Sequence, residues 1–279
     1  QNNADQIEKL TISAVEEAAS SQEDAILIAK VVAVASDELV NKVVEEVSKN
    51  STNENEALSA KVMKSIILIN PDKIKKLSDE NKETMIKQTI EAAKNQNENK
   101  DDNKDDLTDV VADIIFEADP ETSGELIQVL DETELEKDSD LNLSILSKLS
   151  EKEFFEEKLE VVSIRSKRNE IAVENFISNS IKNVEDDKLE TIIDIIGDSE
   201  GIVAEKMIKT GKKDIENKKK VVKIITEIIK KNPKKAIEIF EKNKKNNDFT
   251  NTIKTKVDNK DAITVEDFDK VFDRNISPN

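Results

Sequence analysis

The chain contains no histidine, cysteine, tyrosine or tryptophan among its 279 residues. These four residue types supply most general bases, thiolate nucleophiles, soft metal ligands and aromatic binding anchors in proteins. Without histidine the usual base of a nucleophilic triad is missing, and without cysteine no disulfide can form. We therefore expect a protein that is not an enzyme and that carries no cofactor.

Glycine is also scarce, with four residues in the whole chain, and no Asn-Gly or Asp-Gly pair occurs. Those pairs form the tight turns of β-hairpins, and glycine-rich loops bind phosphate groups, so neither structure is expected. Long apolar runs are missing as well. The most apolar window, residues 25–35, is interrupted by Lys30 and is far shorter than the roughly 20 residues that span a bilayer. We expect no membrane insertion.

Arginine is limited to three residues, Arg165, Arg168 and Arg274, although the chain carries 43 basic and 61 acidic side chains. Arginine is the usual residue for bidentate recognition of phosphates and bases. A formal net charge of −18 also repels nucleic acid and anionic lipid. The composition therefore excludes a nucleic-acid partner.

Apolar residues recur at helical spacing along most of the chain, and no segment alternates convincingly enough to predict a strand. The pattern is carried by Ile26, Ala29, Val32 and Ala33; by Val40, Val43, Val44 and Val47; and by Val62, Ile66 and Ile69. The widest apolar face belongs to Val221, Val222, Ile224, Ile225, Ile228 and Ile229. An all-α fold is predicted, in which Ile114, Ile193, Ile225 and Ile228 are buried between helices.

Three Asn-Pro or Asp-Pro pairs separate apolar helical segments, at Asn70-Pro71, Asp119-Pro120 and Asn232-Pro233. A residue before proline is disfavoured in the α conformation, so the first helix ends there. The Asn or Asp then caps the next helix, and proline occupies its first position. Each pair predicts a helix, a sharp corner and a second helix.

Corners without proline are predicted between these three. Ser36-Asp37 separates two apolar helices, Ser150 and Glu153 form a capping box, and the segment from Gly197 to Gly201 breaks another pair of helices. The last helix is expected to start at Thr264 with Asp267 completing a capping box, and to bury Phe268 and Phe272.

The corners fall near residues 36, 71, 120, 150, 199 and 233, at spacings of about 30 to 50 residues, which are typical of helix-hairpin repeats. In this helix pairing the chain resembles HEAT- and armadillo-like α-solenoids, and that resemblance implies an elongated scaffold or binding surface without transferring any functional residue. An irregular helical bundle is the alternative. The predicted organisation is helical repeats in residues 1–95, a polar loop in 96–106, further repeats in 107–257 and a terminal capping helix in 258–279.

A calcium site is the only metal site that the side chains suggest, because Ca²⁺ takes hard oxygen ligands. The densest cluster of carboxylates contains Asp101, Asp102, Asp105 and Asp106. Runs of charged residues are usually solvated surface, so a simple polar loop is the alternative interpretation.

Charge is unevenly distributed along the chain. Residues 101–150 hold 16 acidic and 3 basic side chains, for a net charge of −13, whereas residues 201–250 hold 15 basic and 7 acidic, for a net charge of +8. Opposite charges on two different surfaces favour a head-to-tail contact between copies of one chain. The expected interface residues are Lys218, Lys219, Lys220, Lys234, Lys235, Asp131, Glu132, Glu134 and Glu136.

These observations predict a structural protein of an extracellular or cell-surface assembly, whose partner is another copy of itself and whose contacts build a head-to-tail filament. The alternative is a monomeric helical-repeat adaptor that binds another protein in the periplasm or cytoplasm. The first residue is Gln1 rather than methionine, which fits either a mature chain that has lost a targeting segment or a fragment of a longer protein.

Overall fold

The computed structural model describes residues 6, 9–13, 25–51, 57–99, 107–132, 139–182, 188–198, 201–242 and 247–272. Within these ranges 89% of the residues are helical and none lies in a strand. The predicted all-α fold is therefore confirmed. No helix in the same ranges combines the length and the hydropathy that crossing a membrane requires.

The chain divides into two compact units. The N-terminal unit consists of Gln1–Glu134 and Val162–Ala172, and the C-terminal unit consists of Leu135–Val161 and Val173–Asn279. The predicted polar loop at residues 96–106 falls inside the sequence range of the N-terminal unit. Two helices, α9 (Phe155–Arg165) and α10 (Lys167–Lys182), contribute residues to both units.

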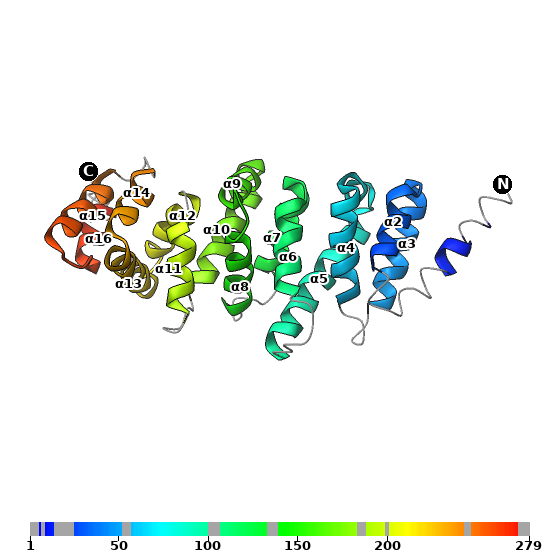
Figure 1. The fold of residues 1–279 in the computed structure, drawn as a ribbon, viewed down its shortest axis with the longest axis horizontal. Coiled ribbons are helices and arrows are strands. Elements are labelled where there is room, and N and C mark those ends of the chain that lie inside the picture. Colours follow the sequence, from blue (N-terminus) through cyan, green and yellow to red (C-terminus); the bar gives the residue numbers. More distant parts are fainter. Residues whose placement is uncertain are drawn as a thin grey trace. The chain divides into compact units, whose positions relative to one another are not determined.

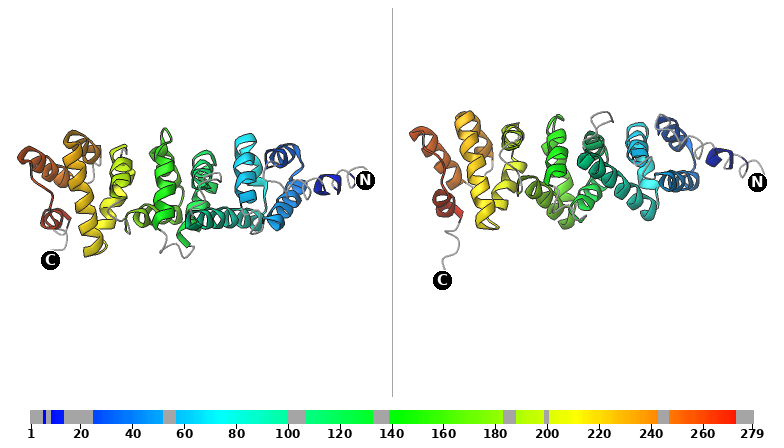
Figure 2. Two further views of the ribbon diagram at one scale, coloured as in Figure 1. Left: turned by 60° about the horizontal axis from the view of Figure 1, so that its bottom comes forward. Right: turned by 90° about the horizontal axis from the view of Figure 1, so that it is seen from below.

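Helices of the N-terminal unit contact not only the next helix in the chain but also the next but one. Helix α4 contacts both α2 and α6, whereas α5 contacts both α3 and α7. Figure 1 shows α2, α4 and α6 in succession, and Figure 2 shows α5 passing beside α4 and α6. The helices are α2 (Ala25–Val34), α3 (Asp37–Asn50), α4 (Ala57–Ile69), the 3₁₀ helix η2 (Pro71–Lys76), α5 (Asp79–Asn99), α6 (Leu107–Glu117) and α7 (Pro120–Glu132).

The C-terminal unit is centred on the longest of its complete helices, α13 (Ile215–Lys231). This helix contacts α11, α12, α14 and α16. The remaining helices are α8 (Ser139–Ser150), α11 (Leu189–Asp198), α12 (Ile202–Gly211), α14 (Pro233–Lys242), α15 (Asn247–Asn259) and α16 (Val265–Phe272). The central place of α13 follows from its apolar face, which is the widest in the sequence.

Aliphatic side chains fill the core of both units. The four isoleucines predicted to be buried, Ile114, Ile193, Ile225 and Ile228, are all buried. Aromatic side chains gather in the C-terminal unit, where the ring of Phe249 lies 5.4 Å from that of Phe240 and 5.7 Å from that of Phe268. Edge-on packing at these distances adds to the stabilisation from burial alone.

At most of the predicted corners, a side chain caps the following helix as expected. At Asp119 the carboxylate accepts hydrogen bonds from the backbone N–H of Glu121 at 3.1 Å and of Thr122 at 3.4 Å. The Oδ1 atom of Asn232 accepts from the N–H of Lys235 at 3.1 Å, and α14 begins at the next residue, Pro233. These bonds satisfy N–H groups that have no partner inside the helix.

The predictions for the corners without proline are confirmed in part. Ser36 caps α3 by accepting from the N–H of Leu39 at 3.3 Å. Thr264 and Asp267 form the predicted capping box before α16, because the carboxylate of Asp267 accepts from the N–H of Thr264 at 2.9 Å. The break between α11 and α12 ends at Gly201, whose φ of 154° is accessible mainly to glycine.

Other local predictions were wrong. Ser150 does not begin a helix: it is the last residue of α8, its hydroxyl donates to the carbonyl of Ser147, and α9 starts only at Phe155. Asn70 makes a corner but does not cap, and its side-chain amide donates to the carbonyl of Ala33 at 3.4 Å. The polar stretch from Asn95 is not all loop, because α5 continues to Asn99.

Candidate functional site

The predicted basic surface lies on α13 and α14 of the C-terminal unit, where the two helices meet at Asn232 and Pro233. The apolar face of α13 is buried, and so its lysines are placed on the remaining faces and at its ends. Lys230 and Lys231 end α13, and Lys234 and Lys235 follow in the first turn of α14. The corner therefore gathers four lysines within six residues.

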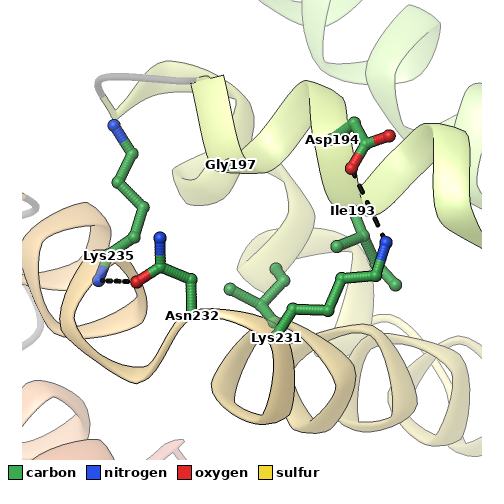
Figure 3. Close-up of a pocket in the computed structure, with 7 residues that line it drawn as sticks. Ile193, Asp194, Gly197, Lys231, Asn232 and Lys235 are labelled. Carbon is green, nitrogen blue, oxygen red and sulfur yellow. Dashed lines mark hydrogen bonds and ion pairs between the residues drawn. The ribbon is translucent and has the colours of Figure 1, made fainter.

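A pocket of about 460 Å³ opens beside this corner. Ile193 and Ile228 form its apolar floor, and Asp194, Gly197, Lys231, Asn232 and Lys235 complete its wall. Figure 3 shows Lys231 reaching towards Asp194 on one side, whereas Asn232 and Lys235 lie on the other. A β-carbon added to Gly197 would meet nothing within 4 Å, so this part of the wall is open.

Ion pairs fix the charge of one side of the pocket. The ammonium of Lys231 lies 2.6 Å from a carboxylate oxygen of Glu190 and 3.8 Å from one of Asp194. The hydrogen bond to Glu190 raises the pKa of Lys231, and the same bond lowers the pKa of Glu190. Because its proton is held more tightly, the Lys231 amine is a poor nucleophile and acts as a fixed positive charge.

A smaller pocket of about 260 Å³ lies on another side of the same corner and is lined by Lys230, Pro233 and Ile229 together with Lys260 and Asp261. Lys230 pairs with Glu227 at 2.7 Å. The α13–α14 corner therefore presents lysine next to apolar side chains in two pockets. Such a surface is suited to bind a partner segment in which a carboxylate stands next to an apolar side chain.

The five predicted basic interface residues have different surroundings within the C-terminal unit. Lys218, at the start of α13, forms an ion pair with Asp269 of α16, and the ammonium of Lys220 donates to the carbonyl of Lys182 at 2.6 Å. Lys219 and Lys234 are exposed, and Lys235 lines the larger pocket.

The predicted acidic residues belong to a different part of the chain. Asp131 and Glu132 are the last two residues of α7, in the N-terminal unit. Glu134 and Glu136 lie outside the described residues, as do the calcium candidates Asp101, Asp102, Asp105 and Asp106. A search of the described ranges finds no group of three or more acidic side chains that could hold a metal ion.

One charged cluster was not predicted. Glu174 of α10 lies 3.9 Å from the ammonium of Lys206, 3.6 Å from that of Lys209 and 3.5 Å from that of Lys213. Burial lowers the pKa of Lys206, with a further contribution from Lys209. Since Lys206 is only 4% exposed, its ammonium is closed to ligands, and the cluster links α10 to α12. The i, i+3 spacing of Lys206 and Lys209 was visible in the sequence, but no sequence pattern identified Glu174 as their partner.

The second missed surface is the outer side of α2 in the N-terminal unit. Ile26 belongs to the helical apolar pattern of the sequence, yet it is 55% exposed, and Leu27 and Val34 are 56% and 87% exposed. The buried residues are Ala25, Ile28, Ala29 and Val32. Because α2 is apolar on nearly all sides, spacing alone did not show which side meets the core. The sequence signal for this exposed face was the near absence of charge in α2, where Lys30 is the only charged residue.

Comparison of the chain with family models, with curated proteins and with solved structures finds no match.

Proposed function

We propose that this chain is a non-enzymatic, helical-repeat structural protein that associates with further copies of itself, basic surface to acidic surface, in an extracellular or cell-surface assembly. The contacts of α4 with α2 and α6, and of α5 with α3 and α7, support the repeat. In repeat arrays each unit packs on its neighbours, and the array as a whole offers long surfaces for binding. An elongated α-solenoid is the architecture that we propose for the chain.

The observation that carries this proposal is the lysine-rimmed pocket with its floor of Ile193 and Ile228. Its complement within the same sequence is the acidic segment that follows α7. There Leu135 stands between Glu134 and Glu136. A leucine on the apolar floor, with carboxylates directed at Lys234 and Lys235 in the first turn of α14, would match this surface in both hydrophobicity and charge.

Contact between two different surfaces of one chain is heterologous, and it generates open filaments when the rotation between copies does not close a ring. Such an assembly needs no catalytic group, which agrees with a chain that lacks histidine, cysteine and tyrosine. Freedom from cysteine also suits an exposed surface, because no thiol is available for oxidation.

Charge reversal at the pocket tests the proposal. In a variant carrying Lys234→Glu and Lys235→Glu, self-association should weaken by about tenfold or more, because attractions at the rim become repulsions. The matched control carries Lys49→Glu and Lys87→Glu, two lysines of the N-terminal unit whose side chains are each 59% exposed. Both variants have the same net charge, and so only a site-specific contact separates them. Sedimentation velocity measures the association.

A rescue experiment distinguishes the loss of a direct contact from a general loss of self-association. The pocket variant is mixed with a second variant that carries Glu134→Lys and Glu136→Lys, and mixed assemblies should form where neither variant assembles alone. Equal weakening in the pocket variant and its control would contradict the proposed interface. A wild-type chain that stays monomeric at high concentration and low salt would favour the alternative, an adaptor that binds an acidic segment of a different protein in the same pocket.

A further inference from the structure

The four lysines of the α13–α14 corner differ in how they are paired. Lys230 and Lys231 end α13, and each forms an ion pair within the chain, at 2.7 Å and 2.6 Å. Lys234 and Lys235 stand in the first turn of α14, and neither forms an ion pair with another described residue. The positive charge of the corner is therefore neutralised on the α13 side and open on the α14 side.

Helix α11 supplies two carboxylates to Lys231. Glu190 and Asp194 are four residues apart on α11, and so both lie on the side of that helix that faces the lysine. Their carboxylate oxygens are 2.6 Å and 3.8 Å from the ammonium of Lys231, and Figure 3 shows the contact with Asp194. These two side chains occupy the position around Lys231 that a carboxylate of a partner would take.

The lysines of α14 stand where positive charge is unfavourable for a helix. The N-terminus of a helix carries a partial positive charge, and acidic side chains are favourable in its first turn. The first turn of α14 contains no acidic residue, but it contains Lys234 and Lys235. Carboxylates bound at the α14 side of the pocket would offset this repulsion.

The two sides of the pocket also differ in what a partner gains there. A carboxylate that binds Lys231 must first replace Glu190, so one ion pair forms where another breaks. Pairs between exposed side chains are weak, and the side chain of Glu190 is 73% exposed, so this exchange adds little to binding. A carboxylate that binds Lys235 breaks no ion pair within the described residues, and therefore adds more.

We propose that Glu190 and Asp194 are internal competitors of the acidic partner, which hold Lys231 in ion pairs and so direct the partner's carboxylates to the lysines of α14. This inference rests on the proposed function, because it takes the acidic segment of a second copy as the occupant of the pocket. Competition of this kind sets specificity through residues of the chain itself. It also fixes the orientation of the bound segment, as a head-to-tail contact requires.

Peptide binding tests the competition. The probe is a fluorescently labelled synthetic peptide with the sequence of residues 131–138, and fluorescence anisotropy measures its binding to the full chain. In a variant that carries Glu190→Gln and Asp194→Asn, the dissociation constant of the peptide should fall by about three- to tenfold, because Lys231 becomes available as a further partner for its carboxylates.

A matched control carries Glu216→Gln and Glu266→Gln, two exposed glutamates of the C-terminal unit that lie outside the pocket. The control changes the net charge by the same amount, and its dissociation constant should differ from that of the wild type by less than about twofold. A third variant adds Lys231→Met to the two pocket substitutions and should lose the gain. Equal tightening in the control, or a gain that persists without the lysine, would overturn the proposal.

Chemical labelling measures the ion pair without any partner. The hydrogen bond to Glu190 raises the pKa of Lys231, so less of its amine is unprotonated and able to react with acetic anhydride. In the Glu190→Gln and Asp194→Asn variant Lys231 should be acetylated at least about twofold faster, whereas the rate at Lys235 should not change, as measured by mass spectrometry. An unchanged rate at Lys231 would overturn the competition even where the peptide binds. A peptide that binds neither the wild type nor the variant would reject the acidic contact itself, and this inference with it.

Discussion

Helix α16, the last helix of the C-terminal unit, buries Phe268 and exposes Glu266 and Lys270, which form an ion pair at 2.9 Å. Helix α2, the first helix of the N-terminal unit to be described throughout, instead exposes Ile26, Leu27 and Val34. Helix α16 thus has a polar outer surface, whereas α2 has an apolar one. Both helices are short, with 8 and 10 residues, so length does not account for the difference.

Sequence composition accounts for it. The residues of α16 divide into a buried apolar side and a charged side, whereas those of α2 are apolar almost throughout. A helix of the first kind keeps a solvated polar side, whereas a helix of the second kind leaves apolar side chains in contact with solvent wherever no neighbour covers it. The comparison shows that the apolar outer face of α2 follows from its composition, since Lys30 is its only charged residue.

The largest expected effect concerns the aromatic cluster that anchors α16. Phe249 is fully buried, and its ring lies 5.0 Å from that of Phe272. Phe249→Ala should lower the free energy of unfolding by about 3 to 5 kcal/mol, because a large cavity forms among the rings. The control is Phe154→Ala, since Phe154 is 65% exposed, and its effect should stay within about 0.5 kcal/mol. Urea denaturation measures both, and similar values would mean that the cluster does not anchor the end of this unit.

Two glycines, one in each unit, should respond to alanine with opposite signs. A β-carbon on Gly124 of α7 would overlap the side chain of Asn169, whose Oδ1 also accepts a hydrogen bond from Gln128 at 2.6 Å. Gly124→Ala should therefore cost about 1 to 3 kcal/mol through overpacking. Gly197 of α11 has open space around it, and Gly197→Ala should raise stability by up to about 1 kcal/mol through helix propensity.

Thermal unfolding followed by circular dichroism compares these two variants with the wild type. A stabilised Gly124→Ala variant would show that Asn169 can move aside, and close packing at α7 would then be wrong.

Smaller effects are expected at two aspartate caps, Asp119 in the N-terminal unit and Asp267 in the C-terminal unit. Burial acts to raise the pKa of each, but hydrogen bonds outweigh burial and lower it, from Thr122 to Asp119 and from Lys256 and Thr264 to Asp267. A lowered folded pKa means that the caps stabilise fully above the ordinary aspartate pKa of about 4 and lose this effect as pH falls through the lower value.

Asp119→Ala and Asp267→Ala should each cost about 1 kcal/mol at neutral pH, and both deficits should shrink in acid. Ser36→Ala is the control, because its cap is an uncharged hydroxyl and its deficit should not change with pH. Urea midpoints measured from pH 7 to pH 3 test this. Deficits of the aspartate variants that stay constant over this range would mean that the carboxylate charge does not contribute.

Helix class, buried positions and most corners were predictable because they depend on local chemistry and spacing. The following proline was enough to predict the caps at Asp119 and Asn232. The apolar spacing of α13 was enough to predict the burial of Ile225. Predictions failed where another hydrogen-bond acceptor competed for the side chain, whether distant or close in the sequence. Asn70 bonds to Ala33 instead of capping, and Ser150 is used to end α8. Sequence spacing does not show such competition.

The candidate site was predictable in part. Lys235 was identified from charge alone, but Lys231 was not among the predicted residues, and the pocket also needs Ile193 and Asp194 from α11, about 40 residues earlier in the chain. Lys218 was predicted at an interface, and within the chain it forms an ion pair with Asp269 that connects α13 to α16. Composition gives the sign of the charge on a surface, whereas packing decides which charged side chains remain accessible to a partner.

The most direct test of the proposed self-association is the mass of the wild-type chain across a salt series, measured by light scattering. Assembly of the basic pocket with the acidic segment should give large species at low salt. Their mass should fall as salt rises, because exposed charges are screened beyond about 8 Å at physiological ionic strength. A mass that stays at one chain at low salt and high concentration, or one that grows with salt, would contradict the proposed contact.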